Sequence, residues 1–442
     1  MNKKKIGIIA GVTLAVTGLS VGGGFAIAHA VQKQSATTTL LLEAKAKSHH
    51  DTISATSASI YCAFAKKIAP LALKLNGKTD SLAFSVVDAF VSYSMEVYLS
   101  NDNVQASYCQ TLGAKSMDEI NQAVFEISSY LGTSADYSYQ DGLDEITGRF
   151  GAANINSLWL DPDLELQDKI DTLLQGLQEY YFADVYHAKP TQAALQSWLK
   201  KVAPTGFDRL PELQVPEDSN ASCVSSYFLQ DHFLPAQEGY LKEEYQSRNH
   251  YLDYTLLDGS KKSVDYIATS YRDGGMVYFG DGYASTSTEI SKSYLTYYLP
   301  DEGTSPFDLI DKVFMNLGQE THGLYRLNVK APYFLIKTDL NLTSTLTNLG
   351  LSELFETSLE KLVKAPEEHV TSIKQDSLLS YDYNGFYAAS ATVVSNAGAA
   401  MPPELKDYNF VVNRPHLFTT SFLGLPVFYG VVNDPGYAPY GA

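Results

Sequence analysis

Cysteine is scarce in this chain, whose 442 residues include only Cys62, Cys109 and Cys223. A low and odd number excludes a disulfide framework, although one pair could form and leave one thiol over. The spacings between the three residues fit no zinc site. The simplest interpretation is that all three side chains are small, buried and hydrophobic.

Positive charge is also scarce, since 32 Lys and Arg face 50 Asp and Glu and the formal net charge is −18. A chain this acidic repels phosphate backbones, so we expect it not to bind nucleic acid. The body of the chain has no cluster of Lys or Arg that would bind a heparin-like polyanion. Hydrophobic residues nevertheless make up 45% of the sequence, which is enough for a sizeable core.

Catalytic and metal-binding motifs are missing or misplaced. Residues 18–22, GLSVG, match the G-x-S-x-G nucleophile elbow, but they lie in an apolar N-terminal stretch and are a chance match. The stretch DPDLELQD has Leu166 where a calcium loop needs glycine, and residues 49–51, HHD, fall in a linker. We therefore expect no cofactor, no metal and no catalytic residue. An exported hydrolase stays a third alternative, because a triad assembles in space and leaves no motif.

The N-terminus carries an export signal. Lys3, Lys4 and Lys5 precede an uncharged stretch from Ile6 to Ala28 that is long enough to span a bilayer. Residues 28–30, AHA, also fit a signal-peptide cleavage site, so residues 1–30 are either a signal peptide or a retained anchor. In both cases the lysines stay inside and the body is exported. Residues 31–52 are expected to be a tether.

Periodicity divides the body of the chain into a helical part and a strand-rich part. Between about 52 and 200, apolar residues recur every three or four positions, which predicts helices, and Asp161-Pro162 is a helix-start signal. After about 221, Tyr and β-branched residues between Asp-Gly turns predict strands. We expect further helices around 306–318 and within 342–355, and two or three strands in the tail. This order predicts an α+β fold in one large domain.

Three C-terminal segments resemble the serpin family in order and separation: YYLPDEGTS (297–305), APYFLIKTDLNLTSTLTNLGLSELF (331–355) and FVVNRPHLFTTSFLGLPVFYGVVNDP (410–435). His416 stands where the family usually has Phe. Weaker, collinear resemblances occur in SLAFSVVDAFVSYSM, SSYFLQDHF and LDGSKKSVDYI. The resemblance implies a serpin-like domain over 53–437, with N-terminal helices packed on large mixed or antiparallel sheets and an exposed reactive-centre loop at about 385–404.

The uncharged run GFYAASATVVSNAGAAM (385–401) takes the position of that loop. In serpins a protease cleaves the loop, and the segment before the cut inserts into a sheet and carries the attached protease with it. A segment that is buried later cannot bear unpaired charges. The resemblance implies insertion through Gly385, Phe386, Ala388, Ala389, Ser390, Ala391 and Thr392. Counts from Gly385 and from Pro402-Pro403 both place the scissile bond at Ala399-Ala400.

The function implied is suicide-substrate inhibition of an extracellular serine protease that prefers small residues, either elastase-like or subtilisin-like. The protein is then a monomer, not an enzyme, and its partner is a serine protease in a covalent acyl-enzyme complex; a membrane contact would run through residues 6–28. The alternative is a non-inhibitory serpin-like adhesion, carrier or scaffold protein. That alternative is favoured by Phe386, by Tyr383 and Asn384 in place of an acidic pair, and by Gln375 and Phe233 where a His near the top of the sheet and a Trp are common.

Overall fold

A computed structural model of the chain describes residues 39–45, 49–77, 79–132, 134–141, 144–204, 210–216, 219–233, 251–315, 320–356, 359–364, 370, 373–382, 385–387 and 405–436. For residues 134–150 and 386–387 it describes the backbone alone. The predicted export segment 1–30 and the predicted scissile bond Ala399-Ala400 lie outside the described residues.

Helices dominate the N-terminal part, as the apolar periodicity predicts. They are α1 (Ala55–Asn76), α2 (Val86–Leu99), α3 (Asp102–Leu112), α4 (Met117–Leu131), α5 (Ile170–Tyr180) and α6 (Gln192–Val202). The Oγ atoms of Ser54 and Ser85 cap α1 and α2, because each accepts a hydrogen bond from a backbone N–H in the first turn. Later in the chain come α8 (Pro306–Phe314), α9 (Thr343–Asn348) and two 3-10 turns at Ser352–Phe355 and Leu359–Lys361.

Two large sheets share the strands. The first has the order β1-β5-β4-β6-β14-β13-β12, and β3 pairs with β4 beside this path. Its strands are β1 (Thr39–Leu42), β3 (Ser134–Asp141), β4 (Asp144–Leu160), β5 (Ala183–His187), β6 (Ala221–His232), β12 (Phe334–Asn341), β13 (Lys374–Asp382) and β14 (Gly385–Tyr387). Parallel and antiparallel pairs both occur, so this sheet is mixed.

The second sheet has the order β15-β11-β8-β9-β10-β16-β17-β2, and β7 pairs with β8. Its strands are β2 (Leu82–Ser85), β7 (Tyr251–Thr255), β8 (Lys261–Gly280), β9 (Tyr283–Glu289), β10 (Ser293–Pro300), β11 (Thr321–Pro332), β15 (Asp407–Val411), β16 (His416–Phe422) and β17 (Leu425–Val432). The predicted α+β class and the predicted C-terminal strands are therefore confirmed.

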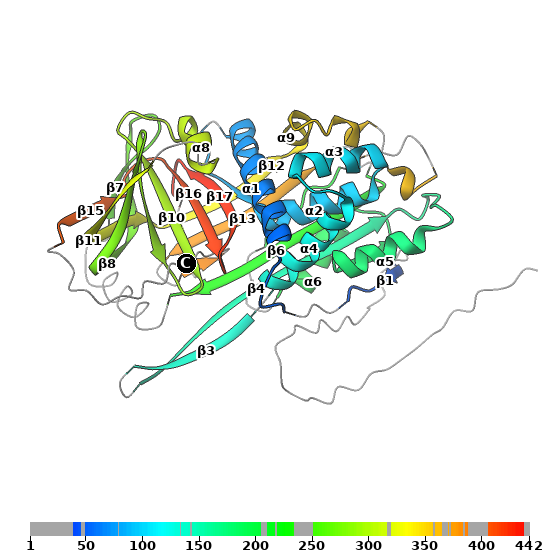
Figure 1. Cartoon of the computed structure of the whole chain (residues 1–442), viewed down its shortest axis with the longest axis horizontal. Helices are drawn as coiled ribbons and strands as arrows, with labels where there is room; N and C mark the ends of the chain where they lie inside the picture. Colours follow the sequence, from blue (N-terminus) through cyan, green and yellow to red (C-terminus); the bar gives the residue numbers. More distant parts are fainter. Residues whose placement is uncertain are drawn as a thin grey trace, which may run out of the picture.

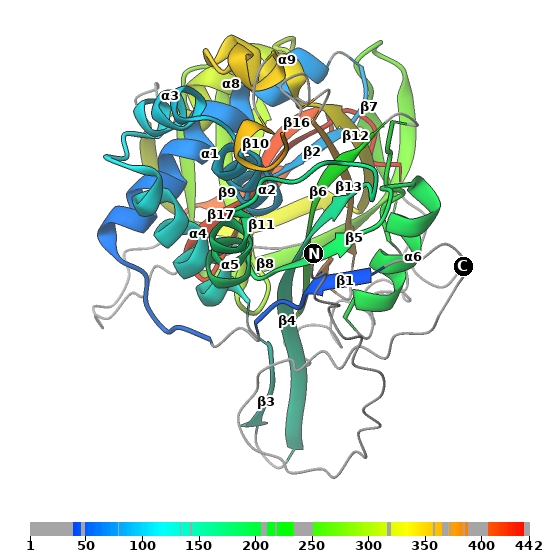
Figure 2. The ribbon, with the colours of Figure 1, turned by 90° about the vertical axis from the view of Figure 1, so that its right-hand side faces the viewer.

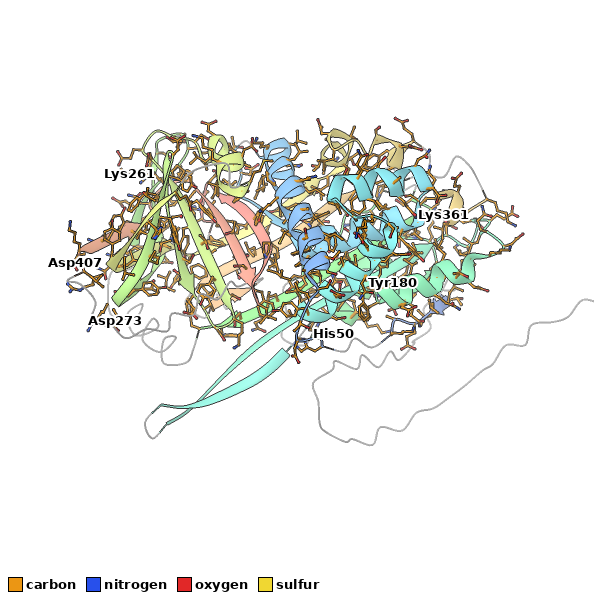
Figure 3. All side chains as sticks on the ribbon, in the orientation of Figure 1. His50, Tyr180, Lys261, Asp273, Lys361 and Asp407 are labelled. Carbon is orange, nitrogen blue, oxygen red and sulfur yellow. The ribbon has the colours of Figure 1, made fainter. Side chains whose placement is uncertain are left out.

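The elements are arranged along one long axis (Figure 1). The curled end of the second sheet, with β15 and β8, occupies one end, whereas α5 and β1 lie at the other. Figure 3 shows the same separation in its labelled side chains, with Asp273 and Asp407 at the first end and Tyr180 and Lys361 toward the second. In Figure 2 the β3–β4 hairpin projects beyond the body of the molecule.

The core joins α1 and α2 to the inner faces of both sheets. Phe64 and Phe90 are fully buried, and their rings meet edge to face with 5.2 Å between centroids. A smaller cluster under α6 contains Trp159, Trp198 and Phe228 and covers the opposite face of β4 and β6. The first sheet is thus covered on both faces around its strands β4 and β6.

Three sequence predictions differ from the structure. Residues 134–160, within the stretch predicted to be mostly helical, form β3 and β4. Asp161-Pro162 begins no helix, since α5 starts at Ile170, and the Asp161 carboxylate accepts from Asp163 N at 3.0 Å in a turn. Residues 39–42, inside the predicted tether, form β1 and pair with β5. At Asp161 the hydrogen bond between its side chain and the nearby backbone stabilises a turn instead of a helix start.

In the described part of the chain, no helix is both long enough and apolar enough to cross a membrane.

Candidate functional site: a gap between two strands

The strand β14 lies between β6 and β13 and is antiparallel to both. Phe386 pairs with Tyr381 on β13 and with Asp231 on β6, and Gly385 pairs with Asp382 and His232. Since β14 runs antiparallel to each neighbour, β6 and β13 run parallel to each other. The beginning of the predicted hinge is therefore already a central strand of the first sheet.

Gly385 is required where it stands. Its φ of 135° is rarely adopted by residues with side chains, and a Cβ would collide with the backbone oxygen of Asp231 and lie 2.8 Å from the Cα of His232. The glycine predicted at the start of the hinge thus lets the chain turn into the sheet in close contact with the end of β6.

Beyond β14 the facing edges of β6 and β13 separate around a cavity of about 400 Å³. Each strand has its other edge paired, β6 with β4 and β13 with β12. Among the described residues no strand lies between Ala221–Leu229 and Lys374–Leu379. We call this space the strand gap. Side chains of both strands line it. In the described structure, the facing edges of β6 and β13 have no strand partner along this stretch.

The two sides of the strand gap come from different segments. Helix α2 forms one side through Asp88, Ser92 and Glu96, together with Ser85, which caps the helix, and residues 211–216 lie on the other side with the cluster under α6. On that second side, the backbone N–H of Gln214 donates to Oδ2 of Asp376 at 3.2 Å and so links the segment to β13. Burial raises the pKa of the Asp376 carboxyl to about 6, and this hydrogen bond opposes the rise.

Two carboxyl groups of α2 face the strand gap. Burial raises the pKa of Asp88 to about 7, although the Ser225 and Gln375 side chains act against the rise. Burial likewise raises the pKa of Glu96 to about 7, and hydrogen bonding with Cys223 opposes it. The Oδ1 atom of Asp88 is buried and has no hydrogen-bond partner in the described part of the chain. An unpaired buried acceptor of this kind costs free energy until a donor reaches it.

Gln375 ties β13 to the first turn of α2. Its Nε2 donates to the backbone oxygen of Ser85 at 2.9 Å, and the backbone N–H of Ser85 donates to its Oε1 at 2.8 Å. The sequence analysis placed Gln375 where a His near the top of the sheet is common. In the structure Gln375 lies near the start of β13, whereas β14 pairs with the end of that strand.

Asp231 fixes the end of β6 beside the hinge. Its side chain is 1% exposed, and Oδ2 accepts from the backbone N–H groups of Ser291 at 3.2 Å and Lys292 at 2.8 Å. Burial raises the pKa of Asp231 to about 6, while these hydrogen bonds oppose the rise. The strand that receives Phe386 is thereby fastened to the turn between β9 and β10.

His416, which stands where a Phe was expected, is buried at the start of β16 in the second sheet. Its Nδ1 lies 3.1 Å from the backbone oxygen of Arg414, which can only accept, so this nitrogen carries the proton. Burial lowers the pKa of His416 to about 4, and the side chain is neutral at pH 7. Its Nε2 has no partner among the residues described.

The structure brings together only part of the predicted site. Gly385 and Phe386 lie in β14, whereas Ala388, Ala389, Ser390, Ala391, Thr392, Ala399 and Ala400 lie outside the described residues. Sequence reasoning did not single out Asp88, Glu96 or Asp231. A signal for the first two exists, because Asp88, Ser92 and Glu96 recur every four residues within the mostly apolar helix VVDAFVSYSMEVYL. The three cysteines are free thiols, and Cys223 lines the strand gap.

Comparisons with known proteins agree with this arrangement. A family model described as "Serpin (serine protease inhibitor)" matches residues 60–435. Serpin-ZX of Arabidopsis thaliana is 25% identical over 63% of this chain and 75% of its own length. Alpha-2-antiplasmin of Bos taurus is 32% identical over 24% of this chain and 21% of its own length.

Solved structures give the same result for the fold. The native state of the thermophilic serpin Tengpin superposes with a TM-score of 0.66 at 16% identity and covers 90% of this chain and 100% of that one. Human thyroxine-binding globulin, solved in complex with thyroxine, has a TM-score of 0.63 at 14% identity, covering 87% of this chain and 100% of that one.

Proposed function

The chain belongs to the serpin family and has a serpin fold, and from this we propose that it is a suicide-substrate inhibitor of an extracellular serine protease. The target prefers small residues, as elastase-like and subtilisin-like proteases do, because Ala399 supplies the carbonyl that it attacks. The protein contributes no catalytic residue and acts as a monomer. Residues 1–30 direct its export, and it is secreted or held on the outer face of the membrane through residues 6–28.

The observation that carries the proposal is the position of β14 at the mouth of the strand gap. Continuing its register without a bulge would pair residues 388–393 with Leu379–Lys374 on β13 and with Leu229–Val224 on β6. Both facing edges of these strands would then gain backbone hydrogen bonds, each contributing about 1 kcal/mol. The free energy released on insertion is what would displace and distort a protease that is still attached through the cleaved loop.

Phe386 is a weaker argument against the inhibitor function than the size of its side chain suggests. A bulky residue at the first inserting position is expected to slow entry into the sheet. The backbone of Phe386 already pairs with both neighbouring strands before any cleavage. We therefore expect this residue not to slow the first step of insertion, because its backbone is already paired on both sides.

The alternative is a non-inhibitory serpin-like adhesion or carrier protein. Its support is the departure from the family pattern at Tyr383 and Asn384. Such a protein would be cleaved in the same loop but would release the protease in active form.

A denaturing gel of the exported chain mixed with an elastase-like protease separates the two functions. We expect a band at the summed mass that survives boiling, and a released peptide whose mass places the cut after Ala399. The control is the same protease with its nucleophilic serine blocked beforehand, which should give no such band. A shortened chain beside fully active protease, repeated with several proteases of small-residue preference, would exclude the inhibitor.

A further inference from the structure

We propose that residues 211–216, which we call the cover, close the outer side of the strand gap under the control of one carboxyl group. The cover is held tightly to β13 when Asp376 is protonated and more loosely when Asp376 is ionised. The contacts of the cover belong to the described structure, whereas any effect on protease trapping rests on the function proposed above.

The cover is fastened to α6. The Gln196 side chain donates from Nε2 to the backbone oxygen of Pro211 at 3.1 Å, and its Oε1 accepts from the backbone N–H of Leu213 at 2.9 Å. Leu213 and Val215 also pack against the hydrophobic cluster that lies between α6 and the strands β4 and β6. The cover therefore belongs with α6, β4 and β6 on one side of the strand gap.

A hydrogen bond joins the cover to β13 across the strand gap. The backbone N–H of Gln214 donates to Oδ2 of Asp376 at 3.2 Å, and both residues line the cavity. Since the cover moves with α6 and β6, any widening of the gap between β6 and β13 stretches or breaks this bond. The strength of the bond between Gln214 and Asp376 therefore affects how easily the gap opens.

Asp376 has carboxyl groups of three other segments near it. Asp339 on β12 is directly opposite Asp376 in the antiparallel ladder, so both residues point to the same face of the sheet. Glu212 of the cover and Asp88 of α2 also interact electrostatically with Asp376. The positive group that acts on Asp376 is Lys374, whose Nζ lies 3.5 Å from Oδ2 of Asp339. Repulsion between like charges therefore destabilises the ionised Asp376 carboxylate while the cover is closed.

The direction of the pH effect follows from the burial of Asp376. Burial raises the pKa of its carboxyl to about 6, the Gln214 hydrogen bond and Lys374 oppose the rise, and Asp339 and Glu212 add to it. Lifting the cover returns the carboxyl to water and brings its pKa back toward the ordinary range of an aspartate. The closed state therefore binds the proton more tightly, so acid favours the closed cover and a rise in pH through about 6 loosens it.

Hydrogen exchange at the Gln214 amide measures how firmly the cover is closed. The intrinsic exchange rate at each pH is divided by the observed rate, and the resulting protection factor reports opening of the cover. In the full exported chain we expect protection at Gln214 to be about three- to tenfold lower at about pH 7 than at about pH 5, because the Asp376 carboxyl loses its proton between these values. Amides of α8, which lies outside the residues that line the strand gap, should not share this change.

Two variants separate the hydrogen bond from the charge. Asp376→Asn keeps an oxygen that accepts from Gln214 but cannot ionise, so protection should be high at both pH values. Asp376→Ala removes the acceptor and should give low protection at both. Asp273→Asn, at the β15 end of the long axis (Figure 3), is the matched control and should behave like the wild type. Equal wild-type protection at both pH values, an Asp376→Asn variant that keeps the full pH dependence, or an equal change in α8 would overturn the proposal.

The outcome for the cover can be distinguished from the outcome for the inhibitor function. At about pH 7, Asp376→Asn should also give more cleaved chain per covalent complex than the wild type, because a tighter cover delays insertion. The expected exchange without a covalent complex in either protein would retain the cover and reject inhibition. A covalent complex together with exchange at Gln214 that neither substitution changes would retain inhibition and reject the cover.

Discussion

Replacing Gly385 with alanine should detach β14 from the end of β6. Alanine at a φ of 135° costs about 1 to 2 kcal/mol in backbone strain, and its Cβ would also collide with the backbone oxygen of Asp231. That oxygen belongs to a strand held by the Asp231 side chain on Ser291 and Lys292, so it cannot yield easily. Relief must therefore come from β14, which would lose its backbone pairing with β6.

The expected cost is about 3 kcal/mol, made up of the strain and of one or two backbone hydrogen bonds at about 1 kcal/mol each. Gly113→Ala is a matched control, because Gly113 has a φ of 73° but nothing lies within 4 Å of the added Cβ, so only strain remains. Hydrogen exchange at the amides of residues 385–387 and 230–232 measures the loss directly.

We expect the Gly385→Ala variant to exchange at these amides at least tenfold faster than the wild type, and to give more cleaved chain per covalent complex because insertion starts later. The Gly113→Ala variant should change neither quantity. If the Gly385→Ala variant keeps full protection at residues 230–232, the close contact between β14 and β6 does not hold the hinge, and the reasoning fails.

Further predictions concern pH, the sheet edge and the scissile bond. Because the folded pKa of Asp88 is raised to about 7, wild-type stability should fall as pH rises from about 4 to 7, by up to about 1.4 kcal/mol per pH unit, and urea titrations of Asp88→Asn should show a shallower fall. His416 has a lowered folded pKa of about 4, so its contribution is lost as pH falls from about 6.5 to 4, and His416→Phe should gain stability relative to the wild type over that window. Leu40→Pro should break the ladder between β1 and β5 and increase oligomers in size-exclusion chromatography, whereas an unchanged monomer peak would show that β1 does not protect the edge. Ala399→Arg should transfer cleavage from elastase-like to trypsin-like proteases, as read by the mass of the released peptide.

Local patterns were sufficient for much of the fold. The predicted helices from 306 and within 342–355 are found as α8, α9 and a 3-10 turn, and α8 begins at a side-chain cap provided by Ser305. The strands β3 and β4 were missed, since Gly148, Gly151 and Asn154 are typical of turns and depress the strand signal. Pairing with β6, which is distant in sequence, overrides that local preference in the ladder from residue 150 onward.

The site was predicted less completely for a physical reason. The run 385–401 stands out in the sequence because its small and uncharged residues are unusual in themselves. The lining of the strand gap does not stand out in the sequence. Its residues Asp88, Ser225 and Gln375 come from three distant segments and are brought together only where α2, β6 and β13 meet. An unpaired buried oxygen is a property of the assembled structure, and no periodicity encodes it.

The strand β1 is the point at which a tether from the predicted export segment would join the first sheet. It enters the first sheet at the edge beside β5, at the opposite end of the long axis from β15, where the chain returns after residues 388–404 (Figure 1). With an anchor retained at 6–28, the ten residues 29–38 between anchor and strand reach at most about 36 Å when fully extended. The β1 edge of the first sheet would then be held within that distance of the membrane, and β15 would lie farther from the tether along the long axis.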